Sequence, residues 1–175
     1  MKAKLFLVCG LPGSGKTTFA KRFATENGFA YLCIDDCYTE INGDETDHSN
    51  KFKVWQRFYY LINECQENRV DVVVEAMSLD HYARHEFISW FPGFSHHLIL
   101  ITNDFEECCR NVALRRRDIS LEGMLELKDR CRYPDINEQR EWDSGIQVVA
   151  PTNFVMDLVG TKDYFNLNLL KGVTP

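Results

Sequence analysis

The sequence predicts an α/β protein in which a mainly parallel sheet lies between layers of helices. Short apolar runs alternate with amphipathic segments along the chain. Strands that alternate with helices are joined by crossover connections, which make neighbouring strands parallel. The length of 175 residues, 45% of them hydrophobic, fits one domain with a sizeable core. We therefore expect residues 1–175 to form a single domain.

Apolar runs that end at glycine or at acidic residues predict the strands. The first run ends at Gly10, and the second begins after Gly28 and ends at Asp35. In chain order, the predicted strands cover residues 5–9, 29–34, 70–75, 97–101, 146–150 and 154–158.

Apolar residues at steps of three and four predict the helices between these strands. Phe105, Cys108 and Val112 have this spacing, Gly28 stops the first helix, and Ser120 can cap the last one. In chain order, the predicted helices cover residues 16–26, 51–68, 81–90, 104–116 and 120–131. The polar segment 39–50 is expected to be a mobile loop.

Composition limits the classes of function. The chain carries 26 acidic and 20 basic residues, and this excess of acid argues against a globally basic coat for nucleic acid. Its seven cysteines are odd in number and show no Cys-x-x-Cys spacing, so we expect reduced thiols and no zinc site. No apolar run approaches the ~18 residues of a membrane span. We expect a cytoplasmic protein with no membrane partner.

The histidines add no candidate site. His81, His85, His96 and His97 have no partner visible in the sequence. We expect ordinary surface or strand histidines at these positions.

The segment GLPGSGKTT, residues 10–18, follows the first predicted strand and begins the first predicted helix. Gly10-x-x-x-x-Gly15-Lys16-Thr17 is the complete phosphate-binding loop (P-loop) pattern in its required strand–loop–helix context. Backbone N–H groups of such a loop turn toward phosphate oxygens, and the helix directs its positive end at the same anion. Lys16 is expected to reach the outer phosphates, and the Thr17 hydroxyl to bind Mg²⁺. The residues expected to bind the nucleotide are Gly10, Pro12, Gly13, Ser14, Gly15, Lys16, Thr17 and Thr18.

Other motifs separate the classes of P-loop protein. A GTPase switch usually needs Asn-Lys-x-Asp, and an oligomeric ATPase usually shows a long apolar run ending in Asp-Glu together with a second domain; the sequence has neither. The third predicted strand ends in VVVE, which puts Glu75 where an acid can assist a metal. A small kinase is therefore the leading interpretation.

A kinase needs a group that activates the acceptor hydroxyl. Asp35 and Asp36 follow the second predicted strand, and ligands of doubly wound sheets bind at the carboxyl ends of the strands. A carboxylate there orients a hydroxyl and accepts its proton. Asp36 also fits a helix cap or a turn, so we expect Asp35 to be the general base.

Three consecutive arginines, residues 115–117, end the fourth predicted helix. At about 100° per residue, Arg116 continues the apolar face, Arg115 lies at its edge and Arg117 points away. The arginines either suit the helix dipole or belong to a lid that closes over the transferred phosphoryl group. We favour the lid.

Together these motifs resemble the small P-loop kinases similar to the kinase domain of polynucleotide 5′-hydroxyl kinase. The similar segments are GLPGSGKTT, YLCIDDCY, VVVEAMSL and CCRNVALRRRDISLEGMLELKDRCRYPD, within residues 3 to 135. The resemblance implies a three-layer P-loop kinase fold with a small helical lid at about residues 110–132. It also implies ATP as donor, Asp35 as general base and Arg115 as the lid arginine. The helical face favours Arg116 instead, and both remain candidates.

The sequence departs from that family on the acceptor side. Tyr38 stands where the nucleic-acid kinases of the group usually have an arginine, and Ala76-Met77-Ser78 stands in place of an Asp-x-Asn pattern. Asp36, Tyr38 and Ser78 are the residues expected to contact the acceptor. The aromatic residues that either stack on a base or pack in the core are Tyr38, Trp55, Phe58, Tyr59 and Tyr60.

The favoured function is ATP-dependent phosphorylation of a hydroxyl on a nucleic acid or nucleoside-type acceptor, with Mg²⁺. The hydroxyl is either a 5′ end or a group on a modified base in DNA. The alternatives are a small-molecule kinase for a nucleoside, sugar or antibiotic, and a non-enzymatic nucleotide-binding module. Residues 35–50 include six acidic residues and no Lys or Arg, which repels a polyanionic strand unless the segment swings away.

Overall fold

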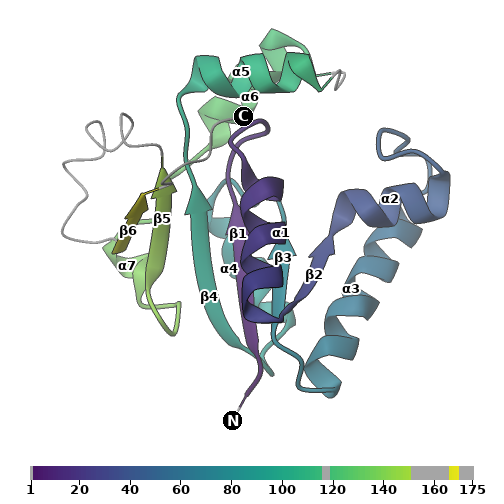
Figure 1. Ribbon diagram of the computed structural model, residues 1–175, viewed down its shortest axis with the longest axis vertical. Coiled ribbons are helices and arrows are strands. Elements are labelled where there is room, and N and C mark those ends of the chain that lie inside the picture. Colours follow the sequence, from purple (N-terminus) through teal and green to yellow (C-terminus); the bar gives the residue numbers. More distant parts are fainter. Residues whose placement is uncertain (1, 116–118, 151–165, 170–175) are drawn as a thin grey trace.

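A central sheet of parallel strands organises the protein (Figure 1). The structure is a computed structural model that describes residues 2–115, 119–150 and 166–169. The described strands are β1 (Lys4–Cys9), β2 (Ala30–Cys33), β3 (Val72–Glu75), β4 (Ser95–Ile101), β5 (Ile146–Ala150) and β6 (Asn166–Leu169). Their order in the sheet is β2-β3-β1-β4-β5-β6, and every neighbouring pair is parallel.

Helices cover both faces of the sheet and its upper end (Figure 1). The described helices are α1 (Lys16–Asn27), α2 (Ile34–Asn42), α3 (Lys51–Glu67), α4 (His81–Trp90), α5 (Phe105–Leu114), α6 (Leu121–Arg130) and α7 (Ile136–Gln139). α1 packs on one face, whereas α3 and α4 pack on the other. α5 and α6 lie beyond the carboxyl ends of the strands (Figure 1), where parallel α/β sheets bind their ligands.

The central strand β1 shows how the sequence holds these layers together. Side chains of a strand alternate between the two faces, and a parallel sheet covered on both faces is apolar throughout. Leu5 and Leu7 pack in the core beneath α3 and α4. Phe6 and Val8 pack in the core beneath α1. The fold class predicted from alternating strands and helices is therefore confirmed.

The segment after β2 differs from the prediction. The second strand ends at Cys33, and residues 34–42 form α2, although the polar segment 39–50 was expected to be a loop from its start. Ile34, Cys37, Tyr38 and Ile41 have the helical spacing i, i+3, i+4, i+7, and all four pack against the core. Burial of this apolar face stabilises the helix, which the polar composition of residues 39–50 did not predict.

The lid region and the C-terminal part also differ from the predicted bounds. α5 ends at Leu114 and Arg115 is its C-cap, so the helix predicted over 104–116 extends too far at its described end. Arg116, Arg117 and the strand predicted over 154–158 lie outside the described residues. The short helix α7 and the strand β6 were not predicted. None of the described helices combines the length and the apolar character that crossing a membrane requires.

Candidate active site

The P-loop connects β1 to α1 through a turn that only glycine fits at two positions. Gly10 and Gly13 have φ of 149° and 78°, in the region that favours glycine. A side chain at Gly10 would overlap the carbonyl oxygen of Ile101 at the end of β4, and one at Gly13 would overlap the carbonyl oxygen of Cys108 in α5. The loop is therefore pressed between the sheet and α5.

Polar contacts hold this loop in a shape suited to an anion. Asn111 Nδ2 in α5 donates a hydrogen bond of 3.0 Å to the Gly13 carbonyl, and Lys16 Nζ donates one of 3.0 Å to the Leu11 carbonyl. Gly15 is the N-cap of α1, and its cap has no side-chain hydrogen bond. Ser14 Oγ is buried without a hydrogen-bond partner. A buried hydroxyl in this state, beside the start of a helix, is a donor suited to a phosphate oxygen.

Thr17 and Glu75 meet beside the loop. Thr17 Oγ1 donates a hydrogen bond of 2.7 Å to Glu75 Oε1, and the other carboxylate oxygen, Oε2, accepts one of 2.6 Å from the Tyr31 hydroxyl. Glu75 is buried at the carboxyl end of β3. Burial and the hydrogen bond to Glu75 both raise the pKa of Tyr31, so its phenol stays protonated and donates. A hydroxyl and a carboxylate are ligands that Mg²⁺ accepts, so this pair fits the predicted metal position.

A cavity of about 530 Å³ lies over the P-loop. Lys16 and Pro12 line it from the loop, Asp35 from α2 and Glu75 from β3. The segment after α2 closes another side through Glu45, Thr46 and His48. Leu127 of α6 and Ile119, shortly before that helix, line it from the lid side. We refer to this space as the donor cavity because Lys16, the residue predicted to bind the phosphates, lines it.

A second cavity of about 500 Å³ adjoins the first and has aromatic walls. Trp55 and Tyr59 line it from α3, and their rings lie 5.4 Å apart between centroids. Trp90 of α4 contacts Tyr59 edge-on at 4.6 Å between centroids. Lys51 and Glu86 provide charged groups in the lining. We refer to this space as the aromatic cavity.

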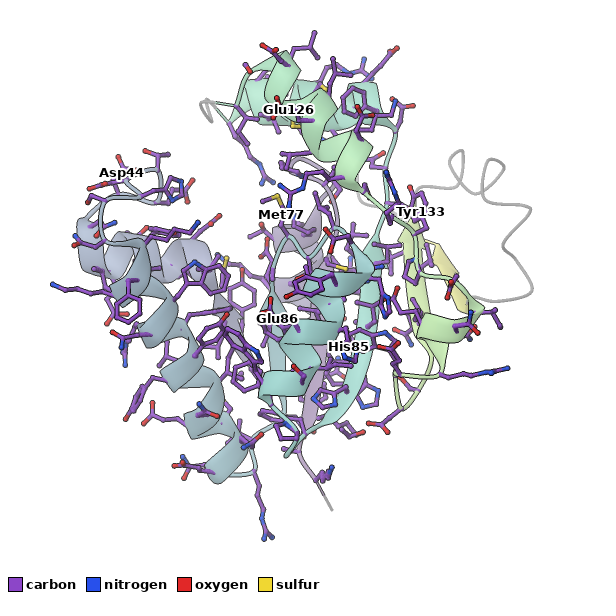
Figure 2. The ribbon with its side chains drawn as sticks, turned by 180° about the vertical axis from the view of Figure 1, so that it is seen from behind. Asp44, Met77, His85, Glu86, Glu126 and Tyr133 are labelled. Carbon is purple, nitrogen blue, oxygen red and sulfur yellow. The ribbon has the colours of Figure 1, made fainter. Side chains whose placement is uncertain are left out.

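Asp35 lines both cavities. It lies in the first turn of α2, next to the end of β2. Ile34, His48, Ala76 and Met77 are the other residues common to the two linings. Figure 2 shows Met77 between the segment that carries Asp44 and the lid helix that carries Glu126. The residue predicted as general base thus stands where the two spaces meet.

The predicted acceptor residues occupy different positions. Tyr38 and Ser78 line the aromatic cavity, and the Tyr38 ring meets the His48 ring edge-on at 4.5 Å. Burial, reinforced by the negative charge of Asp35, raises the pKa of Tyr38. Asp36 is exposed and lines neither cavity.

The five aromatic candidates divide in the same way. Tyr38, Trp55 and Tyr59 line the aromatic cavity. Phe58 is fully buried in the core, as the alternative of core packing expects, and Tyr60 is exposed, with its hydroxyl bonded to Glu64. Only the first three are available to stack on an acceptor in this cavity.

The lid helices pack directly against the P-loop. Cys108, Val112 and Met124 form a small buried cluster, and Leu11 of the loop packs against it. Lys128 Nζ lies 4.5 Å from the centroid of the Phe105 ring. Thr18, predicted to bind the nucleotide, is exposed on α1.

The role of the lid arginines in catalysis stays a prediction. Arg115 is the C-cap of α5, is exposed, and lines neither of the two cavities. Arg116 lies outside the described residues.

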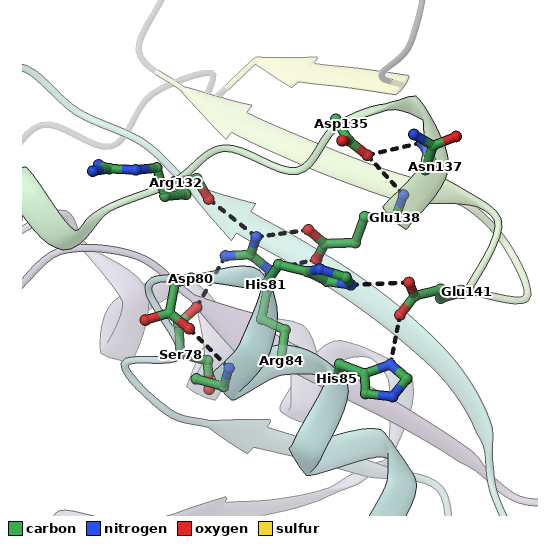
Figure 3. A network of polar contacts seen from close by, with 11 residues as sticks. Ser78, Asp80, His81, Arg84, His85, Arg132, Asp135, Asn137, Glu138 and Glu141 are labelled. Atoms are coloured by element: carbon green, nitrogen blue, oxygen red, sulfur yellow. Dashed lines mark hydrogen bonds and ion pairs between the residues drawn. The ribbon is translucent and has the colours of Figure 1, made fainter.

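Sequence reasoning missed a buried ion pair behind the aromatic cavity (Figure 3). Arg84 of α4 is 1% exposed, and its guanidinium contacts the Glu138 carboxylate at 2.5 and 2.8 Å. It also donates to the carbonyls of Ser78 and Arg132. Burial lowers the pKa of Arg84, but the hydrogen bond with Glu138 and the negative charge of that residue raise it above its ordinary value, so the guanidinium stays charged. Arg84 thereby ties the wall of the aromatic cavity to the chain that follows the lid.

Comparison with known proteins agrees with this geometry. A family model described as an AAA domain matches residues 5–134. The comparison with curated proteins gave no sequence match.

Solved structures share the fold at low identity. A chain of the Pnkp1/Rnl/Hen1 RNA repair complex superimposes with a TM-score of 0.68 at 12% identity, over 99% of this chain and 80% of that one. A sugar kinase from Janibacter sp. HTCC2649 gives 0.60 at 16% identity, over 93% and 95% of the two chains. The Mycobacterium tuberculosis APS kinase CysC, in complex with AMPPNP and APS, gives 0.59 at 16% identity, over 91% and 98%. The fold is that of small P-loop kinases.

Proposed function

Because the chain belongs to the AAA domain family matched over residues 5–134 and has the fold of small P-loop kinases, we propose that it is an ATP-dependent phosphotransferase. It moves the γ-phosphoryl group to a hydroxyl of a nucleic acid or nucleoside-type acceptor. One observation carries the proposal: Asp35 lines both the donor cavity with Lys16 and the adjoining aromatic cavity. A carboxylate in this position can contact an acceptor hydroxyl in one cavity while the phosphoryl donor lies in the other.

The P-loop residues bind the donor. The N–H groups at the start of α1 and the Ser14 hydroxyl donate to phosphate oxygens, and Lys16 exchanges the Leu11 carbonyl for the outer phosphates. Thr17 and Glu75 would hold Mg²⁺, and the bound ion would supply positive charge beside the phosphates. Tyr31 orients the Glu75 carboxylate from behind.

Asp35 acts on the acceptor. Its carboxylate accepts the proton of the acceptor hydroxyl while the hydroxyl oxygen forms a bond to the γ-phosphorus. The bond between that phosphorus and the bridging oxygen breaks, and ADP leaves with the electron pair. Positive charge from the lid, supplied by Arg115 or Arg116, stabilises the transferring group.

The aromatic cavity selects the acceptor. Trp55 and Tyr59 present flat apolar surfaces. Stacking on such side chains favours binding of a nucleobase, whichever of the bases it is. Lys51 and Glu86 supply hydrogen-bonding groups in the same lining. A base held there places its own hydroxyl, or that of the attached ribose, toward Asp35. The cavity volume of about 500 Å³ suits one nucleoside unit, or one base turned out of a strand.

A small-molecule kinase is the second candidate, and Glu45 favours it. This carboxylate lines the donor cavity, where its negative charge opposes the approach of a polyanionic strand. A neutral nucleoside, sugar or antibiotic meets no such repulsion. A non-enzymatic nucleotide-binding module needs neither Asp35 between two cavities nor aromatic walls beside it.

Transfer of labelled γ-phosphate from ATP tests the proposal. DNA and RNA with 5′-hydroxyl ends, DNA carrying a hydroxylated base, free nucleosides, and sugars or other small alcohols are compared at saturating ATP and Mg²⁺. We expect label on an acceptor that contains a nucleoside unit, and none with Asp35→Asn over the same time. Label only on a non-nucleoside alcohol would select the second candidate. ATP binding without transfer to any acceptor would support the binding module.

A further inference from the structure

Two histidines and a glutamate converge on the face of the molecule beside α4 (Figure 3). His81 and His85 lie one turn apart on α4, and Glu141 follows α7. His81 Nε2 is 2.9 Å from Glu141 Oε1, and His85 Nδ1 is 2.9 Å from Glu141 Oε2. One ligand atom from each residue lies within 4.8 Å of the other two. Three donors this close are spaced to hold a single ion.

The elements that carry these donors are fixed relative to each other. Arg84 lies between the two histidines on α4, and its buried contacts with Glu138 hold α7 against α4. Asp80 caps α4 by accepting from the Ala83 N–H, and Asp135 caps α7 by accepting from the Asn137 and Glu138 N–H groups. The donors therefore sit on preorganised backbone, which lowers the cost of binding an ion.

The ligand types select the class of ion. Imidazole nitrogens suit Zn²⁺, Cu²⁺, Ni²⁺ and Fe²⁺, whereas Mg²⁺ and Ca²⁺ prefer sites made of oxygen. Histidines at i and i+4 on one helix are spaced to ligate one metal ion together. Both histidines are exposed and Glu141 is partly exposed, so an ion can enter from solvent and keep water in its remaining positions.

We propose that His81, His85 and Glu141 form a binding site for a divalent transition metal ion, with Zn²⁺ the best fit. Each neutral imidazole gives a nitrogen lone pair to the ion, and one Glu141 oxygen completes a three-ligand set of the His₂Glu kind. The hydrogen bonds that now join the carboxylate to the two rings are replaced by bonds to the metal. The site is separate from the donor and aromatic cavities, whose linings contain none of these three residues.

The position of the site gives the ion a structural role. It joins α4 to the chain after α7 at the surface, while Arg84 and Glu138 join the same elements inside. Arg84 also bonds the Ser78 carbonyl in the wall of the aromatic cavity. A bound ion therefore stiffens the support of that wall without touching the substrate. The inference does not depend on the proposed kinase activity.

Metal binding is measured on the whole protein with the metal alone. Zn²⁺ is titrated in excess Mg²⁺, which occupies oxygen sites, and bound zinc is counted after equilibrium dialysis. The seven cysteines also bind zinc, so the result is the difference between the wild type and His85→Gln. Glutamine keeps an N–H donor for Glu141 but is a poor zinc ligand, and the melting temperature in EDTA checks that the variant folds.

We expect one zinc ion more on the wild type than on His85→Gln or Glu141→Gln, with affinity at this site lower by at least ~10-fold in each variant. Zinc should raise the melting temperature of the wild type and not that of the variants. Co²⁺ at this site should show visible bands without the charge-transfer absorption of a thiolate ligand. Tyr82→Ala, a change at an exposed position on the same helix, should bind as the wild type does. Equal zinc counts and equal thermal shifts in the wild type and both glutamine variants would overturn the proposal.

Discussion

Thr17 Oγ1 lies 2.7 Å from Glu75 Oε1, although the two residues belong to α1 and β3. The contact exists because β3 and β1 are neighbours with parallel register, Val8 opposite Glu75, so that the end of β3 lies beside the loop that follows β1. Tyr31 holds the second carboxylate oxygen from β2. Three elements thus converge on one oxygen pair at the edge of the P-loop, which makes Glu75 the best-supported protein carboxylate for a metal in the donor cavity.

Glu75→Gln should reduce Mg²⁺-dependent turnover by roughly 10- to 100-fold, because the amide keeps the shape but lacks the charge that attracts the ion. Excess Mg²⁺ should restore part of the rate. The matched change is Tyr31→Phe, which removes only the hydrogen bond to Oε2 and should have a smaller effect. Turnover as a function of Mg²⁺ concentration measures both. An unchanged Mg²⁺ requirement in Glu75→Gln would mean that Glu75 does not serve the metal.

Asp35→Asn should slow transfer by ~10²–10⁴, the usual span for loss of a general base, and leave ATP affinity nearly unchanged. Asp36→Asn is the matched control, since Asp36 is the next residue of the same helix turn but is exposed and lines neither cavity. Single-turnover rates and ATP titrations separate chemistry from binding. The reverse ranking of the two variants would identify Asp36 as the base.

Trp55→Ala should raise KM for the acceptor by about 5- to 150-fold, which corresponds to the ~1–3 kcal/mol of one base–aromatic stack. KM for ATP should stay the same, because Trp55 lines only the aromatic cavity. Tyr60→Ala provides the control, as this exposed ring belongs to the same helix but to neither lining. Equal effects of the two substitutions on the acceptor would show that the aromatic cavity is not where the acceptor binds.

At least one of Arg115→Ala and Arg116→Ala should slow turnover by ~10³-fold or more. Its melting temperature and its affinity for ATP should stay unchanged. Arg115 is exposed at the end of α5, and truncation of exposed residues usually changes stability by less than ~0.5 kcal/mol. Kinetics and thermal melts of both variants check this. A lower melting temperature with normal turnover would mean that these arginines serve stability and have no catalytic role in the lid.

Arg84→Met should destabilise the fold by about 3–5 kcal/mol, because it leaves the Glu138 carboxylate buried without its partner. The double variant Arg84→Met/Glu138→Leu should recover much of that loss, since it removes both buried charges together. Denaturant unfolding of the two variants and of Glu138→Leu gives the coupling as a double-mutant cycle. Additive losses would mean that the contacts of Arg84 with the Ser78 and Arg132 carbonyls matter more than the ion pair.

Local signals predicted the P-loop, the strands β1 to β5 and the position of Asp35 just after the second strand, because each depends on residues within a few positions of one another. The helix α2 was within reach of the same reasoning, since Ile34, Cys37, Tyr38 and Ile41 show helical spacing, but the acidic and polar composition of 39–50 outweighed it. The Arg84–Glu138 pair was not predictable in this way. It joins residues 54 positions apart, and nothing near Arg84 distinguishes it from other charged residues of an amphipathic helix.

The central place of β1 in the sheet has a consequence for how the protein is made. β1 is the first strand of the chain, yet its two neighbours are β3, at residues 72–75, and β4, at residues 95–101. A chain emerging from the ribosome therefore carries an apolar strand with two open edges until β3 has been synthesised, and with one open edge until β4 has followed. Non-local parallel pairing is slow to form, and open apolar strands aggregate. Nascent chains halted before β4 should depend on chaperones, whereas those that extend beyond it can begin to pair both edges of β1.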